Sequence, residues 1–429
     1  MPEQRHPLTG QKPVQGDPTE EWEAEVVIIG GAVGGMGMAI ALSTLGVSSV
    51  VLERHRQIQE INRGDALQPM GLSILERWGV LDRIVELGAY NLKEWTFWNP
   101  RLGYLGTWSF ENLDFPFKYA KVLRHPKIHQ AFSDVVVQRK EIQMHRGATV
   151  TTVLMNDDRI TGVMGTLDDG AVFRARGRVV VGADGQTSHF REFLGIAAEQ
   201  RYVYDHEYLM VFVDKPQIPE LDSRGMRWIT RNGLTVLIPL DGGTTLRVAV
   251  QIEKGSLPKW RKLTNTELLY QLKLRAPVLE KVSATLPGAH SYSVHWLHAD
   301  QYVAHGAALV GDAAHLVHPG TAQGMNMAFC DADILAAVIR NGLRRRNLSD
   351  GVLRQYETIR KPVNLGTMEK SHAQTLHHTQ TGLWHEIWGS RTYRWTLTPE
   401  HMLEMSKAVA GLYNPTAEST GLLKEVATV

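Results

Sequence analysis

The sequence predicts an α/β fold in which a parallel sheet is interleaved with a β-rich region and followed by a helical C-terminal region. Three observations predict it. A short apolar strand runs through a glycine-rich turn into a helix near residue 30. Two further apolar strands, at 178–181 and 307–310, each end in a motif that pairs glycine with aspartate. Between residues 200 and 300, short alternating segments are typical of antiparallel strands.

The first elements form a strand–helix–strand unit. Residues 25–29 and 49–53 predict buried strands because they are rich in β-branched residues, and residues 36–45 predict a helix of small residues. A helix that crosses between two strands pairs those strands in parallel. The sequence therefore predicts a Rossmann-type nucleotide-binding unit.

The turn of this unit, residues 30–35, reads Gly-Gly-Ala-Val-Gly-Gly. Small residues at a helix start let backbone N–H groups approach a pyrophosphate, although such glycines also serve only to pack a helix on a strand. Glu53 follows about 20 residues later, where a carboxylate accepts hydrogen bonds from an adenosine ribose; the alternative is a solvated charge beside Arg54. Together the two features favour an ADP moiety without a 2′-phosphate. The residues expected to bind it are Gly30, Ala32, Val33, Gly35, Glu53 and Arg54, with Ala32 in place of the middle glycine.

The rest of the chain supplies the other layers. Strands near residues 26, 50, 122, 179 and 308 are expected to form the nucleotide-binding sheet, and residues 141–175 antiparallel hairpins. Helices are expected at 69–78, 126–139, 265–275, 322–341 and 353–378. The predicted domains are a flexible N-terminal arm at 1–23, a discontinuous nucleotide-binding domain at 24–96, 120–200 and 301–365, a β-rich domain at 97–119 and 201–300, and a helical C-terminal region at 366–429.

Composition argues against several classes of function. With 46 basic and 45 acidic residues, the net charge of +1 gives no electrostatic reason to bind nucleic acid or an acidic membrane. Cys330 is the single cysteine and no H-E-x-x-H pattern occurs, so we expect neither an internal disulfide nor a metal. No apolar run reaches the roughly 18–20 residues of a membrane span, and residues 1–23 do not resemble a signal peptide. A cytoplasmic protein is expected.

Two motifs follow the later strands. Residues 182–188 read GADGQTS, and residues 311–326 read GDAAHLVHPGTAQGMN. Both place a carboxylate, Asp184 or Asp312, at the carboxyl end of a strand, where ligands of open α/β sheets bind. Each motif alone is ordinary, because Asp-Gly is a common turn and Gly-Asp can cap a helix. Their joint occurrence after the glycine turn favours one shared ligand.

In these three motifs the sequence resembles the single-component flavoprotein aromatic hydroxylases, the family of p-hydroxybenzoate hydroxylase and the ubiquinone-biosynthesis hydroxylases, over about residues 24–365. The resemblance implies a Rossmann-type FAD-binding domain with NAD(P)H as co-substrate. It implies that Asp312 binds the ribityl chain and that Asp184 belongs to a motif used for both FAD and NAD(P)H. Pro319 and Gly320 would lie against the flavin ring as catalytic positions. The other implied FAD contacts are Arg63, Arg124, Gly311, Gly324, Met325 and Asn326, the last three at a helix N-terminus whose dipole stabilises reduced flavin.

The reaction implied by the resemblance is that of a monooxygenase. NAD(P)H reduces FAD, O2 adds to give a flavin hydroperoxide, and one oxygen atom hydroxylates or epoxidises an aromatic, polyketide-like or prenylated small molecule. Such chemistry needs a pocket that excludes water, and the β-rich domain is the expected wall. The residues expected to line this pocket are Met210, Phe212, Trp228 and Ile238. Apolar side chains in such strands also occur as ordinary residues of the hydrophobic core, which is the alternative.

Other classes of function stay open. A FAD-dependent reductase or dehydrogenase of a prenyl or polycyclic substrate uses the same scaffold without inserting oxygen. A non-catalytic escort protein for prenylated partners would lose the Gly-Asp motif, which is intact here. A flavin-dependent halogenase is disfavoured because its W-x-W-x-I-P pattern is absent.

Overall fold

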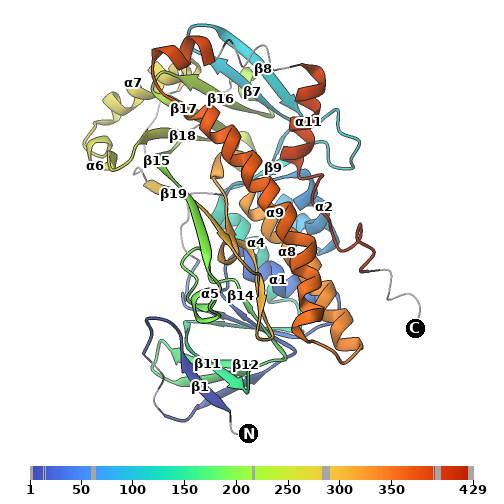
Figure 1. Cartoon of the computed structure of the whole chain (residues 1–429). Coiled ribbons are helices and arrows are strands. Elements are labelled where there is room, and N and C mark those ends of the chain that lie inside the picture. The colour runs from blue at the N-terminus through green and yellow to red at the C-terminus, as the bar shows by residue number, and fades with distance from the viewer. Residues whose placement is uncertain are drawn as a thin grey trace.

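The computed structural model describes residues 3–423 apart from 13, 15, 59–63, 215–217, 283–289, 390 and 392–397. The predicted FAD contact Arg63 therefore lies outside the described residues. The described part of the chain forms four sheets, arranged along the length of an elongated molecule (Figure 1). Within it, no helix is both long and apolar enough to cross a membrane.

The central sheet has six strands in the order β10-β4-β3-β14-β21-β20. Neighbours pair in parallel except β20 and β21, which are antiparallel. The strands predicted near residues 26, 50, 179 and 308 are confirmed, and their continuous apolar runs suit a sheet that is buried on both faces. The six are β3 (Val26–Ile29), β4 (Ser49–Glu53), β10 (Ile142–Arg146), β14 (Val179–Gly182), β20 (Val303–Ala304) and β21 (Ala307–Leu309).

The strand predicted near residue 122 does not join this sheet. β9 (Ala120–Val122) pairs antiparallel with β5 (Ala66–Leu67) and β6 (Tyr90–Leu92) in a three-stranded sheet. The edge position beside β4 belongs to β10 instead. The prediction is wrong because a short buried segment of three residues carries no information about which sheet it joins.

Helices cover the central sheet. α1 (Val33–Thr44) contacts β3, β4, α4 and α8, and α8 and α9 run side by side along the molecule (Figure 1). α8 is buried over most of its length, as its apolar sequence requires. The helices predicted at 69–78, 126–139, 322–341 and 353–378 are confirmed with small shifts at their ends. They are α2 (Pro69–Arg77), α4 (His125–Val136), α8 (Gly324–Arg344) and α9 (Asp350–His378). Two short helices, α3 (Leu81–Glu86) and α5 (His189–Phe193), complete this set.

An eight-stranded sheet, ordered β22-β19-β15-β18-β17-β16-β7-β8, lies at one end of the molecule (Figure 1). One face packs on α7 (Asn265–Arg275) and the other contributes to a second core with α11 (Pro399–Ala410). β15 and β19 form a long antiparallel ribbon with two register shifts. The strands are β7 (Glu94–Asn99), β8 (Gly103–Ser109), β15 (Ala198–Asp214), β16 (Arg224–Thr230), β17 (Gly233–Leu240), β18 (Thr245–Glu253), β19 (His290–Ala299) and β22 (His315–Leu316), with α6 (Leu257–Trp260) beyond β18.

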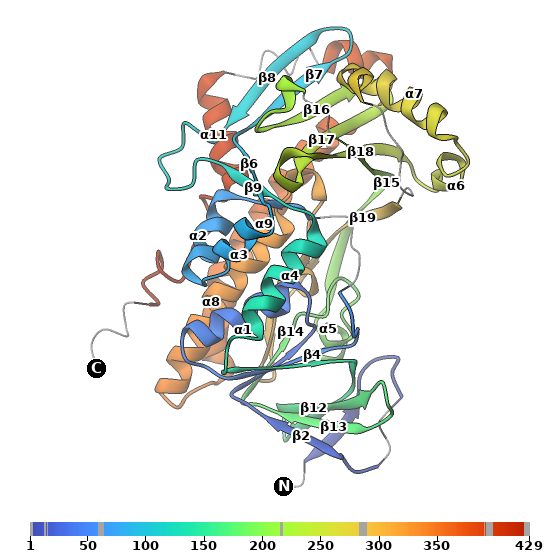
Figure 2. The same cartoon turned by 180° about the vertical axis from the view of Figure 1, so that it is seen from behind.

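A five-stranded sheet at the opposite end contains the N-terminal segment (Figure 2). β1 (Gln4–Pro7) and β2 (Glu20–Glu23) form its two edges, around β11 (Ala148–Asn156), β12 (Arg159–Leu167) and β13 (Val172–Arg176). The predicted flexible arm at 1–23 therefore contains two paired strands within its described residues. The sequences of β1 and β2 are polar because these edge strands are largely exposed. Strands of this kind lack the continuous apolar run that marks a buried strand in a sequence.

Candidate functional site

One cavity of about 560 Å³ collects the predicted motifs. It extends from the glycine turn and the end of β4 to the inner face of the eight-stranded sheet. Its walls include residues of all three motifs, which lie far apart in the sequence and meet here. The predicted contacts that line it are Gly30, Ala32, Val33, Glu53, Arg54, Asp184, Gly311, Asp312, Pro319, Gly320, Gly324 and Met325.

The glycine turn is closely packed at two of its positions. Gly30 has φ +104°, and a Cβ there would lie 2.3 Å from the carbonyl oxygen of Ala183. A Cβ on Gly35 would lie 1.9 Å from the carbonyl oxygen of Gly30. Ala32 is the N-cap of α1 and has φ −77°, a conformation open to any residue. The sequence therefore keeps glycine where packing requires it, and the methyl group of Ala32 causes no backbone strain.

Glu53 holds the glycine turn as well as facing the cavity. One carboxylate oxygen accepts a hydrogen bond from the N–H of Gly31 at 2.7 Å, and the other accepts from the N–H of His55 at 2.8 Å. The alternative of a merely solvated strand-end charge is thus excluded. A carboxylate has about four acceptor positions, so Glu53 retains capacity for the hydroxyl groups of a ribose.

The two later motifs are fastened to each other. Asp184 accepts hydrogen bonds from the Ser188 hydroxyl and from the N–H of Phe190, and burial raises the pKa of Asp184. Arg191, on the helix that follows, donates from Nη1 to the carbonyl oxygen of Ala313 at 2.9 Å. Because Ala313 directly follows Asp312, the two carboxylate-bearing loops hold a fixed spacing.

A buried cluster behind the Gly-Asp motif was not predicted. Asp331 of α8 contacts His315, and Arg360 and Asn364 of α9 donate to its Oδ1 atom, each at 2.9 Å. Its Oδ2 atom accepts from the N–H of Gly311 at 3.3 Å. Burial would raise the pKa of Asp331, but His315 and the Arg360 guanidinium outweigh burial and hold it well below its usual range. A carboxylate inside an apolar helix was the available sequence clue, because a buried charge needs partners.

The eight-stranded sheet closes the far end of the cavity. Met210 and Ile238 line the cavity, together with Tyr208, Val236 and Ala249, and their contact with substrate stays a prediction. Trp228 does not line the cavity, because successive side chains of a strand point to opposite faces of the sheet. The side chain of Trp228 stacks on Trp98 in the core on the α7 face of the sheet. The prediction for Trp228 is therefore wrong.

Four predicted contacts lie outside the cavity wall. Phe212 is covered by the guanidinium of Arg124, 4.9 Å from its ring centre, and Arg124 forms an ion pair with Asp241 at 2.6 Å. The side chain of Asn326 is buried, accepts from the N–H of Gln68 and donates to the carbonyl oxygen of Ala322, each at 2.9 Å. Gly35 serves the packing of the turn. The predicted contacts of these four residues with FAD or substrate stay predictions.

Arg227 is one of the cavity residues that the sequence analysis did not predict. Its side chain is 3% exposed and lies 4.8 Å from the ring centre of Trp95 and 5.2 Å from that of Trp108. Its Nη2 atom donates to the carbonyl oxygen of Gly320 at 2.6 Å. A cation is therefore fixed beside the predicted catalytic turn, among aromatic rings. The available clue was a charged residue within the otherwise apolar run 226–229.

The turn at Pro319 is also held by a histidine. Nδ1 of His318 accepts from the N–H of Gly320 at 3.0 Å, and Nε2 lies 3.1 Å from Nε2 of His206. Burial lowers the pKa of both rings, that of His206 to about 4. Both rings are therefore neutral near pH 7, and they serve to position the turn.

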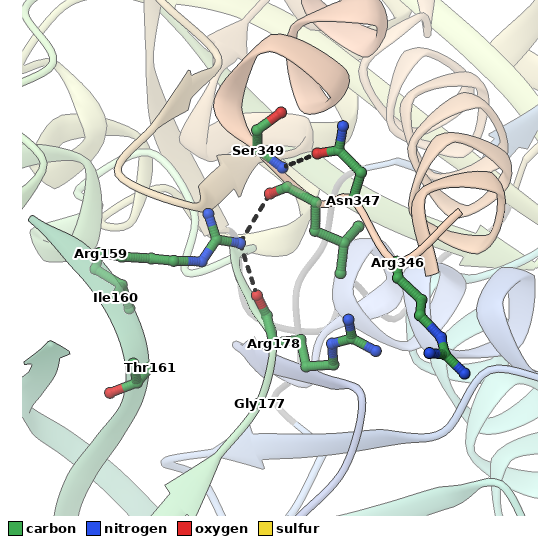
Figure 3. Close-up of a pocket in the computed structure, with 9 residues that line it drawn as sticks. Arg159, Ile160, Thr161, Gly177, Arg178, Arg346, Asn347 and Ser349 are labelled. Carbon is green, nitrogen blue, oxygen red and sulfur yellow. Dashed lines mark hydrogen bonds between the residues drawn. The ribbon is translucent and has the colours of Figure 1, made fainter. Parts of the chain in front are cut away.

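A second cavity of about 380 Å³, shown in Figure 3, has no lining residue in common with the first. Arg159, Arg178 and Arg346 line it. Nη2 of Arg159 donates to the carbonyl oxygens of Leu348 at 2.8 Å and Arg178 at 3.0 Å, so this guanidinium ties β12 to the turn between α8 and α9. None of the predicted site residues lines this cavity.

Comparison with known proteins agrees with the geometry. Residues 23–371 match the family described as FAD binding domain. The chain belongs to this family. A 6-methylpretetramide 4-monooxygenase of Streptomyces rimosus is 27% identical over 358 residues, which cover 80% of this chain and 82% of that protein. A 3-demethoxyubiquinol 3-hydroxylase of Escherichia coli is 26% identical and covers 74% and 80%.

A solved structure extends the likeness to three dimensions. PqsL of Pseudomonas aeruginosa in complex with 2-aminobenzoylacetate is 26% identical, with a TM-score of 0.74 that covers 86% of this chain and 100% of PqsL. PqsL is also described as a probable FAD-dependent monooxygenase. These likenesses confirm the resemblance to flavin-dependent monooxygenases and favour it over the reductase alternative.

The residues present fit FAD. The glycine turn has space where a pyrophosphate would approach the start of α1, since a Cβ on Gly34 would meet no atom within 4 Å. Glu53 stands at the ribose position, and the volume of the cavity is within the range of cofactor sites. Asp312 and the start of α8 lie on the same wall further along.

Proposed function

We propose that this protein is a FAD-dependent monooxygenase that takes its reducing equivalents from NADH or NADPH and inserts one oxygen atom of O2 into an aromatic or polyketide-like acid. Bound FAD would supply the redox and oxygen chemistry. The side chains of the protein would orient the substrate and exclude water. The monooxygenases among its relatives support the class of reaction.

The observation that carries the substrate class is Arg227 beside Gly320. A guanidinium in an aromatic, water-poor pocket favours an anionic oxygen such as a carboxylate or phenolate, because a charge-assisted hydrogen bond is stronger there than in water. Met210 and Ile238 supply apolar contacts for a ring on the same wall. The 2-aminobenzoylacetate bound to PqsL is an aromatic acid, which supports the same choice.

A labelled-oxygen experiment tests the function. Purified holoprotein is incubated with NADH or NADPH, 18O2 and a panel of aromatic acids, and the products are examined by mass spectrometry. The expected result is reductant consumption coupled to the gain of one 18O atom in product. Consumption that yields a reduced product without 18O would instead establish the reductase.

A second readout separates true turnover from leakage. Peroxide is measured in the same reactions, because a poorly fitted substrate consumes reductant without product. A dry, well-filled pocket predicts that coupled substrates release little peroxide.

A further inference from the structure

We propose that the N-terminal segment, residues 3–12, is a wall of the adenosine site, with Leu8 and Gln11 placed to contact the adenine base of FAD. The family match begins at residue 23, so it assigns nothing to this segment. The proposal depends on FAD binding and not on the reaction that FAD supports.

Leu8 and Gln11 line the large cavity at its ribose end. They share that wall with Glu53, Arg54 and His55 and with the first residues of β11. The N–H of Leu8 donates to the carbonyl oxygen of Thr151 at 2.8 Å, which fixes the segment beside β11. β10 pairs with β4 so that Arg146 stands opposite Glu53, and β11 begins two residues later. Leu8 and Glu53 thus line one cavity, to which the start of β11 also contributes.

The segment is held firmly at several points. Glu3 pairs with Arg176 through two hydrogen bonds of 3.2 and 2.9 Å, and the ring of His6 lies 6.3 Å from that of Phe193. Leu8 is 4% exposed and belongs to the main hydrophobic core. The N–H of Gln11 donates to the carbonyl oxygen of Leu8 at 2.9 Å, which closes a turn. A wall with these anchors is formed before a ligand arrives.

The chemistry of the wall suits a purine. Leu8 and Val150 give an aliphatic surface for the flat face of the base. The half-buried Gln11 carries both an amide donor and an amide acceptor, and the edge of adenine also offers both. The flavin ring is expected near Pro319, in the turn before α8, whereas the hydrogen bonds described above attach the segment to β11 and β13. The segment would therefore recognise the adenosine half and leave the flavin half untouched.

Titrations of apoprotein with FAD, FMN and ADP test this proposal. Flavin fluorescence reports FAD and FMN, and calorimetry reports ADP. Leu8→Ala and Gln11→Ala are each expected to weaken FAD and ADP binding by about tenfold, the effect of losing one good contact, while FMN binding stays unchanged. Unchanged FAD affinity in both variants, or an equal loss of FMN affinity, overturns the proposal.

Matched controls separate contact from folding. Leu194→Ala removes a core leucine of similar exposure, 5%, that does not line the cavity, and Gln4→Ala alters an exposed glutamine of the same segment. Both controls are expected to keep wild-type FAD affinity. Thermal unfolding of each apoprotein checks the fold, and if Leu8→Ala does not fold, Gln11→Ala alone decides the question.

Discussion

Gly311 and Asp331 are joined by a hydrogen bond from the backbone N–H of Gly311 to the Asp331 carboxylate, at 3.3 Å. The loop that carries the predicted ribityl contact Asp312 is thus attached to the interior of α8. The same carboxylate holds His315, Arg360 and Asn364. The position of the flavin loop consequently depends on a charge that never meets the cofactor.

Replacing Asp331 is expected to damage both stability and FAD binding. Asp331→Asn leaves the buried Arg360 without its counter-charge, which costs about 3–5 kcal/mol in comparable sites. Urea unfolding measures the first effect and flavin fluorescence the second. Asp333→Asn, two residues along α8, breaks an ion pair with Arg77 and is expected to lower stability while leaving FAD affinity intact. Equal FAD losses in the two variants would show that the contact with Gly311 is unimportant.

The two adjacent glycines of the turn are expected to respond differently to alanine. A Cβ on Gly35 would clash with the carbonyl oxygen of Gly30, so Gly35→Ala should destabilise the apoprotein. Gly34→Ala meets no atom and should stabilise α1 by roughly 0.5–1 kcal/mol. Because Gly34 lines the cavity, its new methyl group should nevertheless weaken FAD binding. Melting temperatures of the two apoproteins, together with FAD titrations, check each half of the prediction.

Arg227 is expected to control the affinity for acidic substrates. Arg227→Gln should weaken binding of 2-aminobenzoylacetate about ten- to a hundredfold, the range for a hydrogen bond to a charged group, and its methyl ester far less. Holoprotein absorbance changes on titration measure both ligands. Arg224→Gln, an exposed change on the same strand, is the control. A variant that loses acid and ester affinity to the same extent would contradict the assigned role.

Buried histidines should make the protein sensitive to mild acid. Burial lowers the pKa of His206 from 6.5 to about 4, so the folded protein keeps this ring neutral while the unfolded chain binds a proton. Stability is therefore expected to be level above about pH 6.5 and to fall as the pH drops towards 4. Melting temperatures across this range measure it, and His206→Gln should flatten the slope. The exposed His401→Gln should not change it.

The motifs allowed the site to be predicted because each ends a strand of one parallel sheet. The carboxyl ends of such strands meet at one edge, so Glu53, Asp184 and Asp312 had to converge. It was harder to predict which side chains of the eight-stranded sheet face the cavity. Met210 and Trp228 both lie on apolar strands, and only the sheet reveals that they face opposite cores.

Long-range partnerships account for what could not be predicted. Asp331 and Arg360 are 29 residues apart on different helices, and no local pattern pairs them. Near the N-terminus, β1 pairs with β11 and β2 pairs with β13, and both partners lie more than a hundred residues further along the chain. A polar edge strand and a loose arm have the same composition, so the sequence does not distinguish them.

The ribbon formed by β15 and β19 has a consequence for the orientation of the eight-stranded sheet. The ribbon pairs Ala198 with Ala299 near the central sheet and continues into the eight-stranded sheet. Its register shifts between Glu199 and Tyr202 and again between Val203 and Glu207. Bulges increase the local twist and bending of a strand, so the ribbon is expected to bend at these two places. The orientation of the eight-stranded sheet over the cavity therefore depends on these two irregularities.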